Sequence, residues 1–358
     1  MKNNPLNPNF NLFKNKKVLI TGHTGFKGSW LAFTLNTFGA EIYGLSLDIP
    51  KNAKHAYFAL RIEDFLANSK SHLSDIRYTD LQDLISKVQP DFIFHLAAQA
   101  LVGEAYKEPY FTFSTNILGT LNLIEAARMT QTKATLIVVT SDKCYKNLNL
   151  EKAYVESDEL GGDDPYSASK AAIEIVFSSY LFSYPNFGAN GIASARAGNV
   201  FGGGDWSTNR LIPDCARDVF AQKVIKIRMP NATRPWTFVH DIINGYITLG
   251  AALKETPEKY RGSWNFASGE NLTVEQITKT FIGFMGYGSI ELVLDNFVDH
   301  ENIFLQIDPS KARTELNWQC NYSIMEALSE TANWYRAQNE GQNMCEYSQH
   351  FLKNYYSR

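Results

Sequence analysis

The sequence has few cysteines, no long hydrophobic run and little net charge, and each absence excludes a class of protein. The four cysteines, Cys144, Cys215, Cys320 and Cys345, lack Cys-x-x-Cys spacing, so they suggest neither a zinc site nor a disulfide framework, and we expect no bound metal. The polar stretch 1–11 contains no apolar signal core, and no later run approaches the length of a membrane span, which predicts a cytoplasmic protein without membrane association. A formal net charge of -3 at pH 7 leaves no broad basic field for nucleic acid.

The order of the apolar segments indicates a large α/β core. The chain has 358 residues, of which 44% are hydrophobic, and it shows no internal repeat, so we expect one large domain or two interleaved ones. Short apolar runs at 17–20, 41–47, 91–97 and 134–141 alternate with longer amphipathic segments. This alternation predicts a doubly wound parallel sheet of the Rossmann type, in which ligands bind at the carboxyl ends of the strands.

A glycine-rich turn follows the first predicted strand. In Thr21-Gly-His-Thr-Gly-Phe-Lys-Gly-Ser-Trp-Leu31, Gly22, Gly25 and Gly28 are spaced three apart before an apolar helix-like segment. Glycine lets the backbone approach a ligand, and a helix N-terminus presents free N–H groups, so this unit predicts a pyrophosphate site. The alternative is an ordinary β-α turn that needs small residues.

Tyr166 and Lys170, in the stretch Asp-Pro-Tyr-Ser-Ala-Ser-Lys, lie one helical turn apart on one face. A phenol titrates near pH 10, roughly, but a neighbouring cation favours the phenolate and can make it a base near neutral pH. Such a base can remove a proton from an alcohol. Because Tyr-x-x-x-Lys pairs also occur by chance on solvated helices, this hypothesis gains weight from the glycine turn that accompanies it.

These features resemble the extended short-chain dehydrogenases/reductases that act on nucleotide sugars. Within that group, five segments are similar to the 4,6-dehydratases that act on CDP-glucose, and the likeness runs from about residue 13 to residue 334. The segments are Thr21 to Leu31, His95-Leu-Ala-Ala-Gln, Thr140-Ser-Asp-Lys-Cys-Tyr, Arg196-Ala-Gly-Asn-Val-Phe-Gly-Gly-Gly-Asp-Trp and Arg210-Leu-Ile-Pro-Asp. The resemblance implies NAD as cofactor, a homodimer, and a role in deoxysugar biosynthesis such as that of lipopolysaccharide O-antigen.

The expected chemistry is an oxidation, an elimination and a reduction. Tyr166 acts as the base at the C4 hydroxyl, Ser141 hydrogen-bonds the resulting alkoxide, a nicotinamide accepts the hydride, and Lys170 also reaches the nicotinamide ribose. A ketone at C4 acidifies C5, and by resemblance Asp142 protonates the leaving C6 hydroxyl while Lys143 takes the C5 proton. Since a lysine must be neutral to act as a base, the alternative for Lys143 is a hydrogen bond to the sugar or to a backbone carbonyl.

The resemblance also assigns the cofactor-binding residues. They are Gly22, Thr24, Gly25, Phe26, Gly28, Asp75, Ile76, Leu96, Ala97, Ala98, Asn116, Tyr166 and Lys170. NAD is favoured over NADP because Ser46 or Asp48, at the end of the second strand, would meet the adenosine ribose. Lys51 and Lys54 follow, however, and could instead hold a 2′-phosphate.

The expected substrate residues are Gln99, Asn199, Asp205, Trp206, Arg210, Leu211, Arg234, Trp236 and His300. Gln99-Ala-Leu-Val-Gly-Glu104 lacks the proline and arginine usual in the CDP-glucose enzymes, and the residues after Trp236 differ from their Gln-His-Val-Leu-Glu, which leaves the base and sugar open. An epimerase or 4-ketoreductase of the same fold, or a non-catalytic nucleotide-sugar binding protein, are the alternatives.

We expect two interleaved domains. Residues 12–195 form an NAD-binding domain, to which a segment near 234–266 returns. Residues 196–345 form mainly a smaller C-terminal domain that binds the substrate.

Overall fold

A seven-stranded parallel sheet is the centre of the molecule. The structure, a computed structural model, describes residues 8–66, 70–188, 191–293 and 304–358. The strand order is β12-β7-β5-β4-β1-β2-β3, and each neighbouring pair is parallel. The strands are β1 (Lys17–Thr21), β2 (Glu41–Ser46), β3 (Ser71–Leu73), β4 (Phe92–His95), β5 (Thr135–Val139), β7 (Ile192–Ala197) and β12 (Gly262–Phe266). The predicted Rossmann-type α/β fold is therefore confirmed, and the four predicted runs correspond to β1, β2, β4 and β5.

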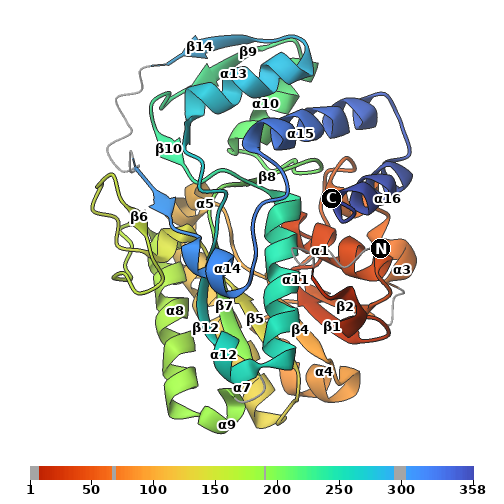
Figure 1. Ribbon diagram of the computed structural model, residues 1–358, viewed down its shortest axis with the longest axis vertical. Coiled ribbons are helices and arrows are strands. Elements are labelled where there is room, and N and C mark those ends of the chain that lie inside the picture. The colour runs from red at the N-terminus through yellow and green to blue at the C-terminus, as the bar shows by residue number, and fades with distance from the viewer. Residues whose placement is uncertain (1–7, 67–69, 189–190, 294–303) are drawn as a thin grey trace.

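Helices cover both faces of this sheet (Figure 1). One face carries α1 (Phe26–Thr37) and α11 (Val239–Glu255), and the other carries α4 (Leu81–Val88), α7 (Gly119–Met129) and α8 (Pro165–Ser183). Side chains alternate between the two layers along each strand, as in β1, where Val18 and Ile20 face α1 and α11 while Leu19 faces the opposite layer. The strands β1, β4 and β5 are buried on both faces, which explains why they appear in the sequence as continuous apolar runs.

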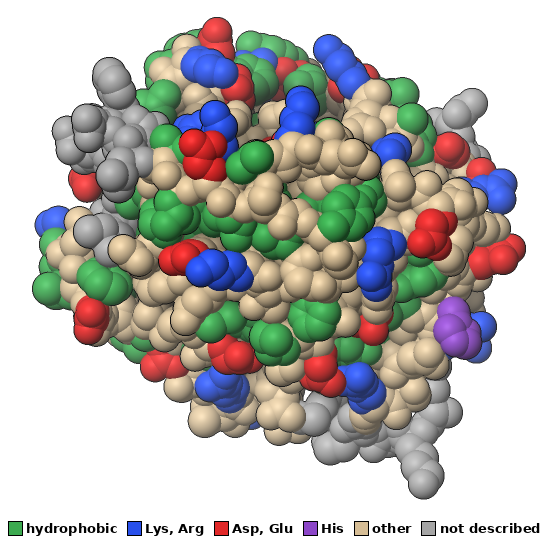
Figure 2. All heavy atoms as spheres, turned by 90° about the horizontal axis from the view of Figure 1, so that it is seen from above, with side chains coloured by type: hydrophobic (Ala, Val, Ile, Leu, Met, Phe, Trp, Pro, Cys, Tyr) green, Lys and Arg blue, Asp and Glu red, His purple; other side chains and the backbone are tan. Residues whose placement is uncertain are grey.

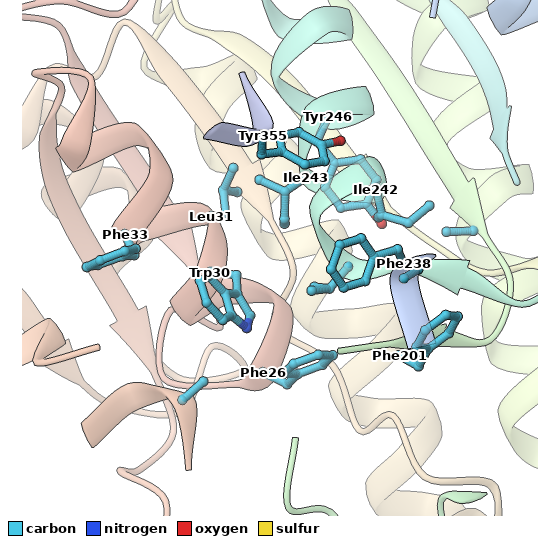
Figure 3. Close-up of a cluster of buried hydrophobic side chains, with 14 of the residues drawn as sticks. Phe26, Trp30, Leu31, Phe33, Phe201, Phe238, Ile242, Ile243, Tyr246 and Tyr355 are labelled. Carbon is cyan, nitrogen blue, oxygen red and sulfur yellow. The ribbon is translucent and has the colours of Figure 1, made fainter. Parts of the chain in front are cut away.

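The α1 and α11 layer packs through large aromatic and aliphatic side chains (Figure 3). Phe26 and Trp30 of α1 face Ile243 and Tyr246 of α11, and Trp30 is fully buried. The indole of Trp30 also donates to the carbonyl of Gly203, 2.9 Å away, so α1 is tied to a loop far along the chain. This packing fixes α1, and with it the glycine turn that begins it.

A smaller helical part lies above the carboxyl ends of the strands (Figure 1). It contains α10 (Leu211–Phe220), α13 (Val274–Met285) and α15 (Ile324–Asn339), with β9 (Val224–Ile227) paired in parallel to β14 (Ser289–Leu292). The chain enters this part after β7, returns to the sheet as α11 and β12, and then leaves again. The segment that carries α11 and β12 therefore lies in the sheet layer between two excursions of the chain.

Short elements complete the described chain. The final helix, α16 (Met344–Tyr355), packs near α1, where the ring of Tyr356 lies 4.8 Å from that of Phe10 and 5.2 Å from that of Phe38. The others are η1 (Phe10–Leu12), α2 (Ala56–Ala59), α3 (Ile62–Phe65), α5 (Val102–Lys107), α6 (Pro109–Phe113), η2 (Ser114–Leu118), η3 (Asp142–Cys144), β6 (Ala153–Tyr154), α9 (Pro185–Gly188), β8 (Val200–Phe201), β10 (Thr233–Arg234), β11 (Thr237–Phe238), α12 (Pro257–Tyr260), β13 (Leu272–Thr273), β15 (Gln306–Ile307) and α14 (Ser310–Glu315).

The surface is mixed in charge. On the face seen from above, Lys and Arg side chains are interspersed with Asp and Glu (Figure 2). Across the described ranges, the helices are all too short or too polar to cross a membrane. Cys144 and Cys215 are buried, whereas Cys320 and Cys345 are partly exposed.

Candidate active site

The glycine turn between β1 and α1 has the shape of a diphosphate cradle. Gly22 has a φ of +78°, and a Cβ there would lie 2.7 Å from the backbone nitrogen of Ala97. A Cβ on Gly28 would lie 2.0 Å from the carbonyl oxygen of Gly22, so only glycine lets α1 approach the turn this closely. Gly25 is the N-cap of α1 and is exposed, which leaves the helix N-terminus open to an anion. Phe26, by contrast, turns its ring into the core, so only its backbone remains for a ligand.

Hydrogen bonds from polar side chains hold the glycine turn between β1 and α1. His23 is buried between Ser46, at 2.9 Å from Nδ1, and Ser71, at 3.0 Å from Nε2, and burial lowers its pKa to about 4. The hydroxyl of Thr24 donates to the carbonyl of Asp48 at 2.8 Å. The Asp48 side chain is exposed at the end of β2, which is the position expected for a ribose contact.

Two further cofactor candidates, Asp75 and Ile76, follow β3. Hydrogen bonds from Arg77, with an ion pair of 2.6 Å, hold the pKa of Asp75 below its usual value. Ile76 is buried against Gly119, where a Cβ would approach it to 2.7 Å. Lys54, considered above for a 2′-phosphate, has its ammonium 5.5 Å from the ring centre of Trp206 instead.

The carboxyl end of β4 lies beside the glycine turn. Leu96 donates its backbone N–H to the carbonyl of Thr21 at 2.9 Å, and Ala97 donates to the Thr21 hydroxyl at 3.2 Å. Ala98 follows in the same loop. His95 is buried between the hydroxyls of Thr21 and Thr120, at 2.6 and 2.8 Å, and burial followed by the charge of Lys170 lowers its pKa to about 3. A neutral imidazole that is hydrogen-bonded at both ring nitrogens supports the loop and does not act in acid-base chemistry.

Asn116 lies in the π-helical turn η2 and connects the β4 loop to α8. Its side chain exchanges two hydrogen bonds with the backbone of Gln99, at 2.8 and 3.0 Å, and donates to Ser169 at 2.8 Å. The side chain of Gln99 in turn bonds Leu101 and Thr112. Both amides therefore organise the loop, and π turns of this kind occur frequently at functional sites.

Tyr166 and Lys170 occupy the first turns of α8. Asp164 caps this helix by accepting from the backbone N–H groups of Tyr166 and Ser167, at 2.9 and 3.0 Å, and Pro165 occupies the first helical position. Both functional side chains are buried, and the Lys170 ammonium lies 5.9 Å from the centre of the Tyr166 ring. The helical spacing read from the sequence thus brings the two groups together.

Burial determines the direction of both pKa shifts in this pair. Burial raises the pKa of Tyr166 to about 12, against the opposing effect of a hydrogen bond with Ser141. Burial also lowers the pKa of Lys170 to about 8, although Glu174 and Cys144 oppose the shift. Desolvation of the phenolate is therefore the largest influence on the pKa of Tyr166.

Ser141, Asp142 and Lys143 form a tight turn directly after β5. Ser141 donates to a carboxylate oxygen of Asp142 at 2.8 Å, and its own oxygen accepts from the backbone N–H of Lys143 at 3.3 Å. Asp142 is buried, and its second carboxylate oxygen has no hydrogen-bond partner among the described residues. Burial raises the pKa of Asp142 against the charges of Lys143 and Arg234. Lys143 is half-buried.

Lys27 and Tyr246 belong to this site, although neither was singled out in the sequence. The Lys27 ammonium lies 3.4 Å from the hydroxyl of Tyr246, which projects from α11 (Figure 3). Burial and the neighbouring charges of Lys170 and Arg210 lower the pKa of Lys27 to about 7. Lys27 could have been identified from the sequence, because it places a lysine within the glycine turn in place of an apolar residue. Lys27, Lys143 and Arg234 lie near enough to Asp142 to interact with its charge, so cations outnumber this carboxylate and the site favours an anionic ligand.

Three of the predicted substrate residues, Arg210, Leu211 and Arg234, lie on the part of the chain between β7 and α11. Arg210 is the N-cap of α10 and pairs with the buried Asp205 at 3.4 Å, and Leu211 begins that helix. Arg234 is buried in β10 and donates to the carbonyl of Thr233 at 2.9 Å.

Three more of these residues have partners within the protein. The buried indoles of Trp206 and Trp236 donate to Gln338 and to the Leu272 carbonyl, at 3.1 and 3.0 Å. The carbonyl of Asn199 accepts from Thr237 at 3.0 Å. His300 lies outside the described residues.

Comparisons with known proteins place this arrangement among enzymes of nucleotide sugars. A family model described as GDP-mannose 4,6 dehydratase matches residues 19–331. The chain is 36% identical to CDP-glucose 4,6-dehydratase of Salmonella typhimurium over 355 residues, which cover 97% of this chain and 98% of that protein. Two solved structures share its fold at 20% identity and 91% coverage of this chain: UDP-glucose-4-epimerase from Stenotrophomonas maltophila with bound NAD, with a TM-score of 0.78 and 99% of that chain covered, and dTDP-glucose 4,6-dehydratase from Bacillus anthracis in complex with NAD, with a TM-score of 0.74 and 98% covered.

Proposed function

The chain belongs to the GDP-mannose 4,6-dehydratase family within the extended short-chain dehydrogenases/reductases, and on this premise we propose that it is an NAD-dependent nucleotide-sugar 4,6-dehydratase that acts on CDP-glucose. The product is CDP-4-keto-6-deoxyglucose. The likeness to the Salmonella enzyme extends over nearly the whole of both chains, which supports the choice of substrate.

One observation carries the proposal within this fold: the buried carboxyl group of Asp142. It is hydrogen-bonded to Ser141, which also bonds Tyr166, and it keeps one oxygen without a partner among the described residues. Burial raises its pKa, and this shift is in the direction that a general acid needs. An epimerase or a 4-ketoreductase needs proton transfer at the C4 oxygen but no acid for elimination, whereas a dehydratase needs both.

The proposed reaction assigns each proton to a residue. Tyr166 takes the proton of the C4 hydroxyl, and Ser141 hydrogen-bonds the oxygen as a ketone forms. The ketone acidifies C5, Lys143 takes the C5 proton, and Asp142 protonates the C6 hydroxyl, which leaves as water. NAD held at the glycine turn would supply the hydride acceptor and the hydride for C6, so no net NADH accumulates. Lys143 returns its proton to C5, and the proton that Tyr166 took from the C4 hydroxyl replaces the one that Asp142 gave to the leaving water, which completes the balance.

The glycine turn fits the diphosphate of the dinucleotide. Gly22 and Gly28 leave no room for a side chain, and the exposed Gly25 opens the N-terminus of α1. We propose that residues 12–195 with the segment near 234–266 bind NAD, and that residues 196–345 mainly bind the substrate. The residence of α11 and β12 in the sheet layer supports this division.

We also propose that the protein is a homodimer in the cytoplasm. Its product would serve deoxysugar biosynthesis for O-antigen. An exposed apolar face on α8 supports the dimer, since Ile175 and Phe182, seven residues apart, are 59% and 89% exposed. Light scattering of a Phe182→Asp variant tests this, because loss of the contact should yield a monomer.

The function is tested by mass spectrometry after incubation with CDP-glucose and with UDP-, dTDP- and GDP-sugars. Loss of one water from CDP-glucose, without net NADH, is the expected result. Asp142→Asn should lose the dehydration but still exchange the C4 hydrogen with the cofactor. Conversion of any sugar without loss of water would instead assign an epimerase or reductase, and no turnover with intact binding would assign a binding protein.

A further inference from the structure

A buried ion pair lies next to the catalytic turn. Glu174 follows Lys170 by one helical turn on α8 and is fully buried, and its carboxylate pairs with the guanidinium of Arg196 on β7 at 2.7 Å. The same carboxylate accepts hydrogen bonds from three hydroxyls. These are Thr140 at 2.5 Å, Ser194 at 2.8 Å and Ser263 at 3.0 Å.

The two members of the ion pair bond opposite ends of one short segment. Glu174 accepts from Thr140, the residue before Ser141, while Arg196 donates to the hydroxyl of Tyr145 at 2.7 Å, one residue after the 3-10 turn. The hydroxyl of Tyr145 in turn donates to the side-chain oxygen of Asn265 on β12 at 2.7 Å. The segment that carries Ser141, Asp142 and Lys143 is therefore held on both sides by a single pair of charges.

We propose that Glu174 and Arg196 are positioning residues, which clamp the Ser141 to Lys143 turn at the height of Tyr166 and Lys170. Tyr166, Lys170 and Glu174 recur every four residues on one face of α8. The helix that carries the proposed base, Tyr166, therefore also carries Glu174, which holds the turn of the proposed acid, Asp142. A shift of about 1 Å between reacting groups can cost roughly a hundredfold in rate, so a clamp at this place acts on kcat.

The network contains a built-in control. Ser263 on β12 bonds the same carboxylate oxygen of Glu174 as the ion pair does, but it does not contact the turn. Thr140→Val removes the hydrogen bond to Glu174 at one end of the turn, and Tyr145→Phe removes the bonds to Arg196 and Asn265 at the other end. Ser263→Ala removes bonds to Glu174 and Ser194 at a place away from the turn. A general loss of stability would affect all three variants alike.

The first experiment compares kcat and KM for CDP-glucose in these variants and in Glu174→Gln. Thr140→Val, Tyr145→Phe and Glu174→Gln should lower kcat by roughly 10-fold to 100-fold with KM within about twofold, and Ser263→Ala should keep both values within about twofold of the wild type. Equal losses in Thr140→Val and Ser263→Ala, or an unchanged kcat in folded Glu174→Gln, would overturn the proposal.

The kinetic measurement rests on the proposed function, so a second readout needs no turnover. Hydrogen exchange followed by mass spectrometry reports on the amides of Lys143, Cys144 and Tyr145. In Thr140→Val and Tyr145→Phe these amides should exchange faster than in Ser263→Ala, while those of β5 stay unchanged. Unchanged exchange across the turn would refute the clamp even if the substrate assignment failed.

Discussion

Asp241 makes the stability of the protein depend on pH in a way that one substitution should remove. This carboxylate on α11 is buried, and it accepts hydrogen bonds from the hydroxyl of Tyr355 on α16 at 2.5 Å and from the backbone of Asn321 at 2.8 Å. Burial raises its pKa from 3.8 to about 7, against the effect of these hydrogen bonds. The group thus joins three distant segments while favouring its neutral form.

The size of the effect on the free energy of unfolding follows from the difference between these two pKa values of Asp241. Between the two pKa values the folded protein holds a proton that the unfolded chain releases, so the free energy of unfolding falls as the pH rises from about 4 to about 7 and is constant above. Each pH unit costs about 1.4 kcal/mol, or about 4 kcal/mol over the whole interval. For a chain of this length, this loss corresponds to about 5 °C in Tm.

Asp241→Asn keeps an acceptor for both hydrogen bonds but cannot ionise. We expect the variant to melt near the wild-type temperature at low pH, and to exceed it by an increasing margin between pH 5 and pH 7. Differential scanning fluorimetry in matched buffers measures this margin, and Asp163→Asn, at an exposed carboxylate, should show no such trend. A margin independent of pH, or a variant less stable than the wild type at pH 8, would refute the reasoning.

Three other predictions concern the site. Tyr166→Phe should lower kcat by about 10² to 10⁴ while the affinity for CDP-glucose, measured by calorimetry, stays the same, since only the proton-accepting oxygen is lost; a change confined to affinity would contradict its role as base. Gly28→Ala should destabilise the protein by about 1–3 kcal/mol and weaken NAD binding, because its Cβ meets the Gly22 carbonyl, whereas Gly103→Ala, with nothing within 4 Å, should be tolerated. Lys27→Met should weaken binding of NAD or of CDP by about 10-fold to 100-fold in titrations, as expected for loss of a charge-assisted contact; Lys279→Met, at an exposed lysine paired with Glu275 at 2.6 Å, should leave both affinities unchanged.

The sequence predicted those parts of the fold and site that depend on local chemistry. The strands could be found because burial on both faces makes them continuous apolar runs, and the glycine turn because Gly22 and Gly28 have no room for a Cβ. Tyr166 and Lys170 were paired by helical spacing alone. The roles of Asp142 and Lys143, which follow Ser141, came from the family resemblance.

Other features depend on long-range packing, which no local pattern encodes. Lys27 and Tyr246 meet across 219 residues, and Glu174 reaches Thr140 and Arg196 on different elements. The effect of burial on the pKa of Tyr166 could not be predicted, because the degree of burial cannot be read from the spacing of two residues. The partners of Trp206 and Trp236 likewise come from α15 and β13, far along the chain.

The interleaving of the two parts has a consequence for how such an enzyme can diversify. The residues assigned to chemistry lie within 141–170, on the sheet and α8, whereas those at Arg210 and Arg234 lie on segments that leave the sheet and come back. Substrate recognition can therefore change through point substitutions in the segments that leave the sheet, without disturbing the reaction. Exchange of the whole recognition part by recombination would instead require several junctions at once, because the intervening segment of α11 and β12 belongs to the sheet layer, where β12 is an edge strand.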